Sequence, residues 1–182
     1  SHYREFFFTQ LGNLVSIVGA HIKPFLLDIL ALIKEFWPPE TPMRQTIIVV
    51  VEQLASALSF DFKPFVPQLM PAILRCFYHD DSPGQTVTAK LINALEVCTP
   101  TLEEQLHLLV PQMVKLLNSP ETAGAVRAAA LSLLLTLVSE LPLRQFAPPI
   151  LHALIPILGS PTAEPQLRSK ALRLCTELAA EM

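Results

Sequence analysis

His21-Ile-Lys-Pro-Phe25 recurs further along the chain as Asp61-Phe-Lys-Pro-Phe65, and the same offset runs through the whole sequence. An apolar stripe follows this period, with a last step that is one residue longer. Each copy of the stripe continues three and seven residues further on, and the copies begin at Leu11, Val51, Leu91, Leu131 and Leu172. That spacing marks one face of an α-helix. The sequence therefore predicts one amphipathic helix that recurs five times.

A second helical element lies between these helices, and proline occurs near its start. Its copies cover residues 24–33, 64–74, 109–117 and 146–155. Proline is tolerated in the first turn of a helix, where the N–H group has no partner within the helix. Two helices in about 40 residues are typical of HEAT and armadillo repeats. Arg127 and Arg168 in the second helices, with Asp81 and Glu121 in the preceding turns, favour the HEAT pattern. We predict an all-α fold, an α-solenoid of HEAT-like helical hairpins with about four and a half repeats and nine helices.

The predicted repeats divide residues 1–182 into one array with units at 21–60, 61–102, 103–142 and 143–182. Residues 3–19 form the second helix of an earlier, partial unit. A single helix pair cannot bury its apolar surface, and stacked neighbours bury it in a continuous core. Phe6, Phe7 and Phe8 make the first helix apolar on nearly all sides. We predict that these three residues form the face on which the solenoid continues, so that the chain is a fragment of a longer array.

Composition excludes several classes of protein. Hydrophobic residues make up 51% of the 182 residues and charged residues 16%, which is too apolar for a disordered chain. The formal net charge of −3 gives no basic footprint for nucleic acid. Residues 6–22 carry no charge but contain several polar side chains, so we predict no membrane-spanning segment. No sequence of n-region, h-region and cleavage site opens the chain, so we also predict no secretory signal. Three dispersed cysteines do not make a disulfide framework, which favours a reducing compartment such as the cytoplasm.

The chain contains no nucleotide-binding or nucleophile motif. Cys76 and His79 are spaced as two ligands on one helix, but a structural zinc site needs four ligands. An enzyme or metal site at Cys76 and His79 stays as an alternative. We predict no catalytic residue, no metal and no cofactor.

Partner binding has two candidate segments. Phe36, Trp37 and Glu40 flank the turn of the first full repeat, and Trp is enriched at interface hot spots. His79, Asp80 and Asp81 occupy the corresponding turn of the next repeat. Trp37 could equally pack locally under the prolines that follow it. Tubulin-binding HEAT arrays carry a Trp in such a loop, but with basic neighbouring turns, whereas the turns here are acidic.

Four strings resemble the HEAT region of the target of rapamycin (TOR) family of phosphatidylinositol-3-kinase-related Ser/Thr protein kinases. They are EFFFTQLGNLVSIV (5–18), LIKEFW (32–37), FYHDDSPGQTVTAKLINAL (77–95) and LHLLVPQMVKLL (106–117). The resemblance implies a non-catalytic scaffold segment for complex assembly in nutrient and growth signalling, with the kinase domain outside these residues.

The same resemblance implies which partners to expect. They are other HEAT segments of the chain or of a TOR dimer, a Raptor-type subunit and a Rheb-type small GTPase, with no nucleic acid. The expected location is the cytoplasm, including the surface of lysosomal or vacuolar membranes through the complex. The alternative is a HEAT adaptor of another class: a nuclear-transport receptor, a phosphatase scaffold or a tubulin-binding array.

Overall fold

A computed structural model describes residues 2–37 and 41–181 of the chain. These residues form α-helices and short 3-10 segments, with no strand in the described ranges. The α-helices are α1 (His2–Val18), α2 (Leu26–Phe36), α3 (Thr41–Leu58), α4 (Val66–Tyr78), α5 (Thr86–Val97), α6 (Leu106–Asn118), α7 (Gly124–Glu140), α8 (Ala147–Gly159) and α9 (Pro165–Glu181). The 3-10 segments are η1 (Gly19–Phe25), η2 (Ser59–Phe65), η3 (Pro83–Gln85), η4 (Thr99–Thr101), η5 (Glu103–Gln105) and η6 (Arg144–Phe146).

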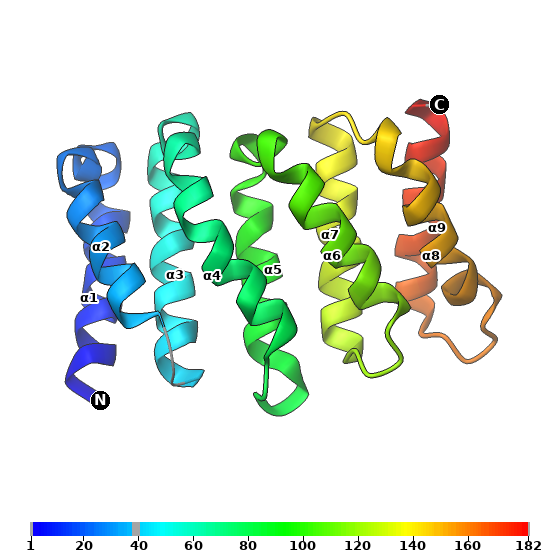
Figure 1. The fold of residues 1–182 in the computed structure, drawn as a ribbon, viewed down its shortest axis with the longest axis horizontal. Helices are drawn as coiled ribbons and strands as arrows, with labels where there is room; N and C mark the ends of the chain where they lie inside the picture. The colour runs from blue at the N-terminus through cyan, green and yellow to red at the C-terminus, as the bar shows by residue number, and fades with distance from the viewer. Residues whose placement is uncertain (1, 38–40, 182) are drawn as a thin grey trace.

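The helices stack side by side in two layers, with the chain termini at opposite ends of the stack (Figure 1). The first layer contains α2, α4, α6 and α8. The second contains α1, α3, α5, α7 and α9, in which each helix packs against the next one in the row. One continuous apolar core lies between the layers. The predicted all-α solenoid of HEAT-like hairpins is thereby confirmed.

The helix count differs from the prediction of nine separate helices. η1 joins α1 to α2 without a break, and η2 joins α3 to α4 in the same way. Within the described ranges, the nine α-helices therefore make seven uninterrupted helical runs. The repeat boundaries at 21–60, 61–102, 103–142 and 143–182 stay a prediction.

The Lys-Pro-Phe repeat forms the bend between consecutive helices at one edge of the stack. Ile22 in η1 and Phe62 in η2 are buried in the core. Lys23 pairs with Asp61 at 3.0 Å, which links η1 to η2. Lys63 then pairs with Glu104 at 3.2 Å, one repeat further on. Exposed ion pairs contribute little to stability, so the two buried side chains hold these bends in place.

The inner helices α3, α5 and α7 bury the predicted stripe, but the end helices α1 and α9 do not, and Leu14 in α1 is 48% exposed. Val51, Leu91 and Leu131 are buried, but Leu172 is 61% exposed. The buried residues of α9 are Ala171, Leu174 and Leu178, which continue the period of the other helices without the longer last step. The predicted register was therefore wrong by one residue in this repeat. One residue turns a helix by about 100°, which carries Leu172 out of the interface.

Two helical runs, His2–Phe36 and Met43–Tyr78, are long and apolar enough to cross a membrane if only their length and composition are considered. Each run doubles back on itself, at η1 or at η2 (Figure 1). Their straight parts are shorter than the roughly 20 residues that a spanning helix needs. The longest part, α3, has 18 residues. The absence of a membrane span stays a prediction.

Candidate functional site

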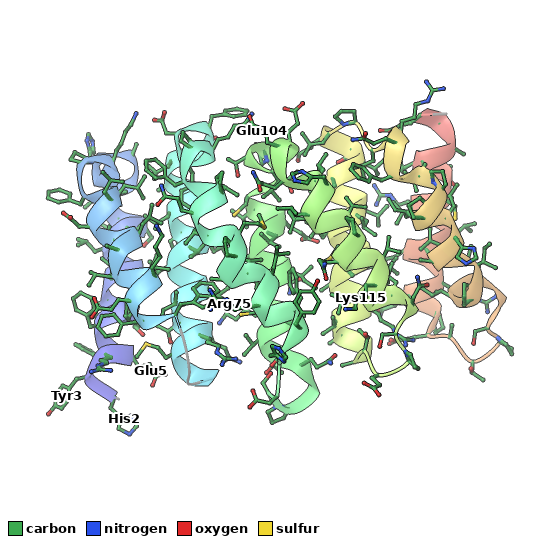
Figure 2. All side chains as sticks on the ribbon, viewed as in Figure 1. His2, Tyr3, Glu5, Arg75, Glu104 and Lys115 are labelled. Carbon is green, nitrogen blue, oxygen red and sulfur yellow. The ribbon has the colours of Figure 1, made fainter. Side chains whose placement is uncertain are left out.

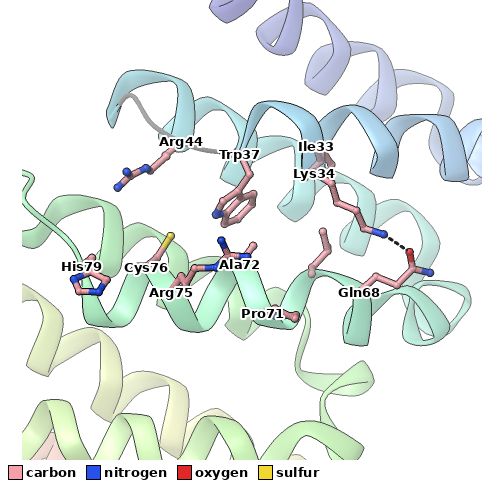
Figure 3. Close-up of a pocket in the computed structure, with 11 residues that line it drawn as sticks. Ile33, Lys34, Trp37, Arg44, Gln68, Pro71, Ala72, Arg75, Cys76 and His79 are labelled. Carbon is pink, nitrogen blue, oxygen red and sulfur yellow. Dashed lines mark hydrogen bonds between the residues drawn. The ribbon is translucent and has the colours of Figure 1, made fainter.

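A cleft of about 430 Å³ opens between α2 and α4 in the first layer. The tight packing of the second layer is absent here, because α2 and α4 make few close contacts. Side chains from α2, α3 and α4 converge on the cleft (Figure 3). The lining residues are Ile33, Lys34, Trp37, Arg44, Gln68, Leu69, Pro71, Ala72, Arg75, Cys76 and His79.

The floor of the cleft is apolar. Trp37 is 7% exposed, and its indole lies over α4 in Figure 3. Burial raises the pKa of the neighbouring Cys76 thiol, although a hydrogen bond with Trp37 and the nearby Arg44 oppose this shift. The thiol is therefore uncharged near neutral pH, which does not suit a nucleophile or a metal ligand. Cys98 is more deeply buried in the core, and burial raises its pKa to about 12.

The rim of the cleft is basic. Lys34 donates a hydrogen bond to Gln68 Oε1 at 2.6 Å, which bridges α2 and α4 at one end. Arg75 is exposed on α4, and its side chain makes no hydrogen bond or ion pair with any residue in the described ranges. Arg44 and His79 lie toward the other end (Figure 3). The cleft thus combines an apolar floor with cationic walls.

The predicted residue Phe36 lies on the other side of α2 from the cleft. Its ring packs edge-on against Phe8, with centroids 5.9 Å apart. The guanidinium of Arg4 lies 5.1 Å from its centroid. Phe36 and Trp37 are neighbours in sequence but point about 100° apart around the helix, so they do not form one surface. Glu40, the third residue of this predicted group, lies outside the described residues.

The three residues of the predicted continuation face, Phe6, Phe7 and Phe8, do not share one surface either. Phe6 and Phe7 are at least half exposed, as an outer face requires, but Phe8 is buried at 1% exposure. The assignment of Phe8 to an outer face was therefore wrong. Its ring lies between α1 and α2, where it contributes to the core.

His79 lines the cleft, but Asp80 and Asp81 do not. Asp80 organises the turn before α5: it accepts hydrogen bonds from the backbone N–H groups of Ser82 at 3.0 Å and Thr88 at 2.8 Å, and from the Ser82 hydroxyl. Partial burial would raise the pKa of Asp80, but these hydrogen bonds outweigh it and hold the pKa below its usual value. Asp80 is therefore a structural residue, while Asp81 is exposed to solvent.

Replacing Asp80 should expose this structural role. We expect Asp80→Ala to lower the free energy of unfolding by about 1–2 kcal/mol at pH 7, because two backbone donors lose their acceptor. Asp81→Ala is the matched control and should change it by less than about 0.5 kcal/mol. Chemical denaturation at several pH values measures both.

The pH dependence of this difference has a defined sign. Because the folded pKa of Asp80 is depressed, its stabilisation is complete above the unfolded pKa of about 3.9 and disappears as pH falls through the folded pKa. The wild-type advantage over Asp80→Ala should therefore shrink in acid. An equal loss from both variants at pH 7 would contradict the structural role.

Sequence reasoning missed the basic residues around the cleft. Lys34, Arg75 and Lys115 occupy the last turns of α2, α4 and α6. They recur at nearly the same period as the core stripe, so the periodicity contained the signal. The apolar stripe alone does not contain these residues, because they lie on the exposed side of the first-layer helices.

The alternative of a metal site at Cys76 and His79 finds no further ligands among the described residues. Within residues 2–37 and 41–181, no group of three or more His, Cys, Asp or Glu side chains could hold a metal ion.

Arg127 and Arg168, which supported the HEAT pattern, each donate a hydrogen bond to a carbonyl at the end of the preceding first-layer helix. The acceptors are Ser119 at 2.6 Å and Leu158 at 3.5 Å.

No protein-family model matches the chain. Over all 182 residues the chain is 38% identical to the serine/threonine-protein kinase mTor of Drosophila melanogaster, and the match covers 7% of the fly protein. It is 33% identical to the serine/threonine-protein kinase TOR2 of Saccharomyces cerevisiae over 156 residues, which are 86% of this chain and 6% of the yeast protein. It is 29% identical to the serine/threonine-protein kinase tor1 of Schizosaccharomyces pombe over 155 residues, or 85% of this chain and 7% of that protein.

These matches and the fold define the class of the chain as an α-solenoid segment related to part of large serine/threonine-protein kinases. The chain belongs to the target of rapamycin (TOR) family. It spans 5–7% of the length of the curated relatives it matches. The resemblance noted in the sequence is therefore confirmed.

Proposed function

We propose that the chain is a non-catalytic scaffold segment of a TOR-like protein kinase, which assembles protein complexes in nutrient and growth signalling. The observation that carries the proposal is the coincidence of two facts. The whole chain matches TOR kinases while covering about 7% of their length, and its described residues form stacked helical hairpins. The kinase domain of the parent protein lies outside these residues.

A solenoid acts through its geometry. Small rotations between neighbouring repeats set the curvature of the stack, and one layer of helices offers a long surface to partners. The proposed partners are a Raptor-type subunit, a Rheb-type small GTPase and other HEAT segments of the same chain or of a TOR dimer. Phe6 and Phe7 on the exposed side of α1 suit contact with another helical unit. The proposed location is the cytoplasm, with recruitment to lysosomal or vacuolar membranes through the complex.

Affinity purification of the full-length parent protein from its own cells tests this function. We expect a very large protein that brings down Raptor-like and Lst8-like subunits, identified by mass spectrometry. A tagged unrelated protein from the same cells provides the background. A smaller parent that brings down tubulin, Ran or a phosphatase catalytic subunit would support an adaptor of another class.

The position of Trp37 bears on the tubulin alternative. Its side chain is buried at the floor of a cleft, so it cannot project into a partner as an anchor. A cleft with an aromatic floor suits the opposite role, in which it receives a side chain from the partner. This argument favours the TOR proposal over a tubulin-binding array.

A further inference from the structure

Three cations recur at the same place in consecutive first-layer helices. We name Lys34, Arg75 and Lys115 the basic row. Figure 2 shows Arg75 and Lys115 at the same level on α4 and α6, and all three residues are exposed. None of them forms an ion pair with any other residue of the described chain.

The helix dipole explains part of this pattern. A cation in the last turn of a helix is favoured by a few tenths of a kcal/mol up to about 1 kcal/mol. That effect accounts for basic residues at helix ends, but it does not account for the open apolar cleft between them. In an ordinary solvated helix surface, the side chains between the cations would be polar.

The space beside the basic row is apolar and large enough for a side chain. Ile33, Trp37, Leu69 and Ala72 provide its apolar surface, within a volume of about 430 Å³. No Asp or Glu is among its lining residues in the described part of the chain. Asp80 and Asp81 lie beyond one end, next to His79 and Arg44, and Asp80 is already committed to the start of α5.

The basic row continues past the cleft at Lys115 on α6, which remains available to a ligand. Lys115 Nζ lies 4.5 Å from the ring centroid of Tyr78, and Gln112 donates a hydrogen bond to the Tyr78 hydroxyl at 2.8 Å. These contacts join α4 to α6 and present a cation on an aromatic ring. The row ends at α8, where Pro156 occupies the same place in the helix as Lys115 does in α6.

We infer that the cleft and the basic row together bind an acidic segment of a partner protein that carries one large apolar side chain. The apolar side chain enters the cleft over Trp37, and the flanking carboxylates face Arg75, with Lys34 and Lys115 at either side. Charge complementarity selects an acidic partner, because the described lining of the cleft supplies cations and no Asp or Glu. This inference rests on the proposed scaffold function and names the chemistry of one of its partners.

A peptide titration on the purified full-length protein tests the inference. The probe is a fluorescein-labelled peptide in which one Phe lies between two Asp-Glu pairs, and binding is measured by fluorescence polarisation. We expect saturable binding that weakens as salt rises. Arg75→Glu should weaken it by about tenfold or more. Arg173→Glu, an equal charge change on exposed α9, should leave it unchanged.

Two altered peptides separate the apolar and charged parts of the site. Replacing Phe by Ser should weaken binding by about tenfold. A peptide with Lys in place of its acidic residues should have a higher affinity for the Arg75→Glu variant than for the wild-type protein. The inference is overturned if the original peptide does not saturate the wild-type protein, if Arg75→Glu binds it equally well, or if the Ser peptide binds as well as the Phe peptide.

The same preparations keep this inference distinct from the proposed function. The subunits that co-purify with each variant report on complex assembly, whatever the peptide does. If a TOR-type complex assembles but the peptide does not bind, the inference falls and the scaffold function stands. If the complex is of another class, the scaffold proposal falls independently of the titration.

Discussion

Phe62→Ala is expected to lower the free energy of unfolding by about 3–5 kcal/mol. Phe62 is 1% exposed and immediately precedes Lys63-Pro64-Phe65, the second copy of the Lys-Pro-Phe repeat, where η2 bends the chain from α3 into α4. It lines an apolar void of about 10 Å³ with Val51 and Leu91. Truncation would enlarge this void in a packed core and remove the side chain that holds the bend. Equilibrium denaturation in urea measures the loss.

Phe60→Ala is the matched control for this prediction. Phe60 lies two residues earlier in the same 3-10 segment but is 69% exposed. Its removal should change the free energy of unfolding by less than about 0.5 kcal/mol. Similar losses from the two variants would mean that η2 does not hold Phe62 in the core.

Replacing Phe6 by Glu and Ile17 by Lys should prevent self-association of the 182-residue chain. The outer face of α1, which consists of Tyr3, Phe6, Phe7, Leu14 and Ile17, is about half exposed or more at every position. An apolar stripe of this kind favours association in water. We expect wild-type sedimentation coefficients to rise with concentration and those of the double variant to stay at the monomer value. The two substitutions leave the net charge unchanged.

The double variant Thr9→Glu and Ser16→Lys provides the control. It places the same two charges on the same helix, at exposed positions away from the apolar stripe. This control should associate like wild type, because the stripe remains intact. Loss of association in both variants would point to charge on α1 as the cause, whereas persistence in both would show that another surface mediates it.

The sequence predicts the repeat well because each helix pair has the same burial requirement. Val51, Leu91 and Leu131 are buried at the expected period. The error at Leu172 arises because Ala171 and Leu172 are both apolar, and pattern matching preferred the larger side chain. Packing prefers Ala171, whose position faces α7 in the unbroken register. Hydrophobicity alone cannot separate two adjacent apolar positions on an end helix.

The candidate site was harder to predict than the fold. Trp37 and His79 do line one cleft, but Phe36 faces Phe8 and Asp80 stabilises the start of α5. Residues that are adjacent in the sequence, such as Phe36 and Trp37, point in different directions on a helix and so belong to different surfaces. Lys34 and Arg75 belong to different repeats, and only the placement of α2 beside α4 in the first layer brings them to the same rim. The recurrence of basic residues at the period was visible, but their relation to a cleft was not.

The packing of each second-layer helix against its neighbours in the row has a kinetic consequence. Helix contacts in this stack join elements that are at most about one repeat apart in sequence, so less chain entropy is lost before each contact forms than in folds that pair distant segments. Topologies of this kind fold fast, and folding can begin at any helix pair and spread to both sides. The backbone amides of α1 and α9, each packed on one side within the described row, should exchange hydrogen sooner than those of α5. We therefore expect the most slowly exchanging helices at the centre of the stack.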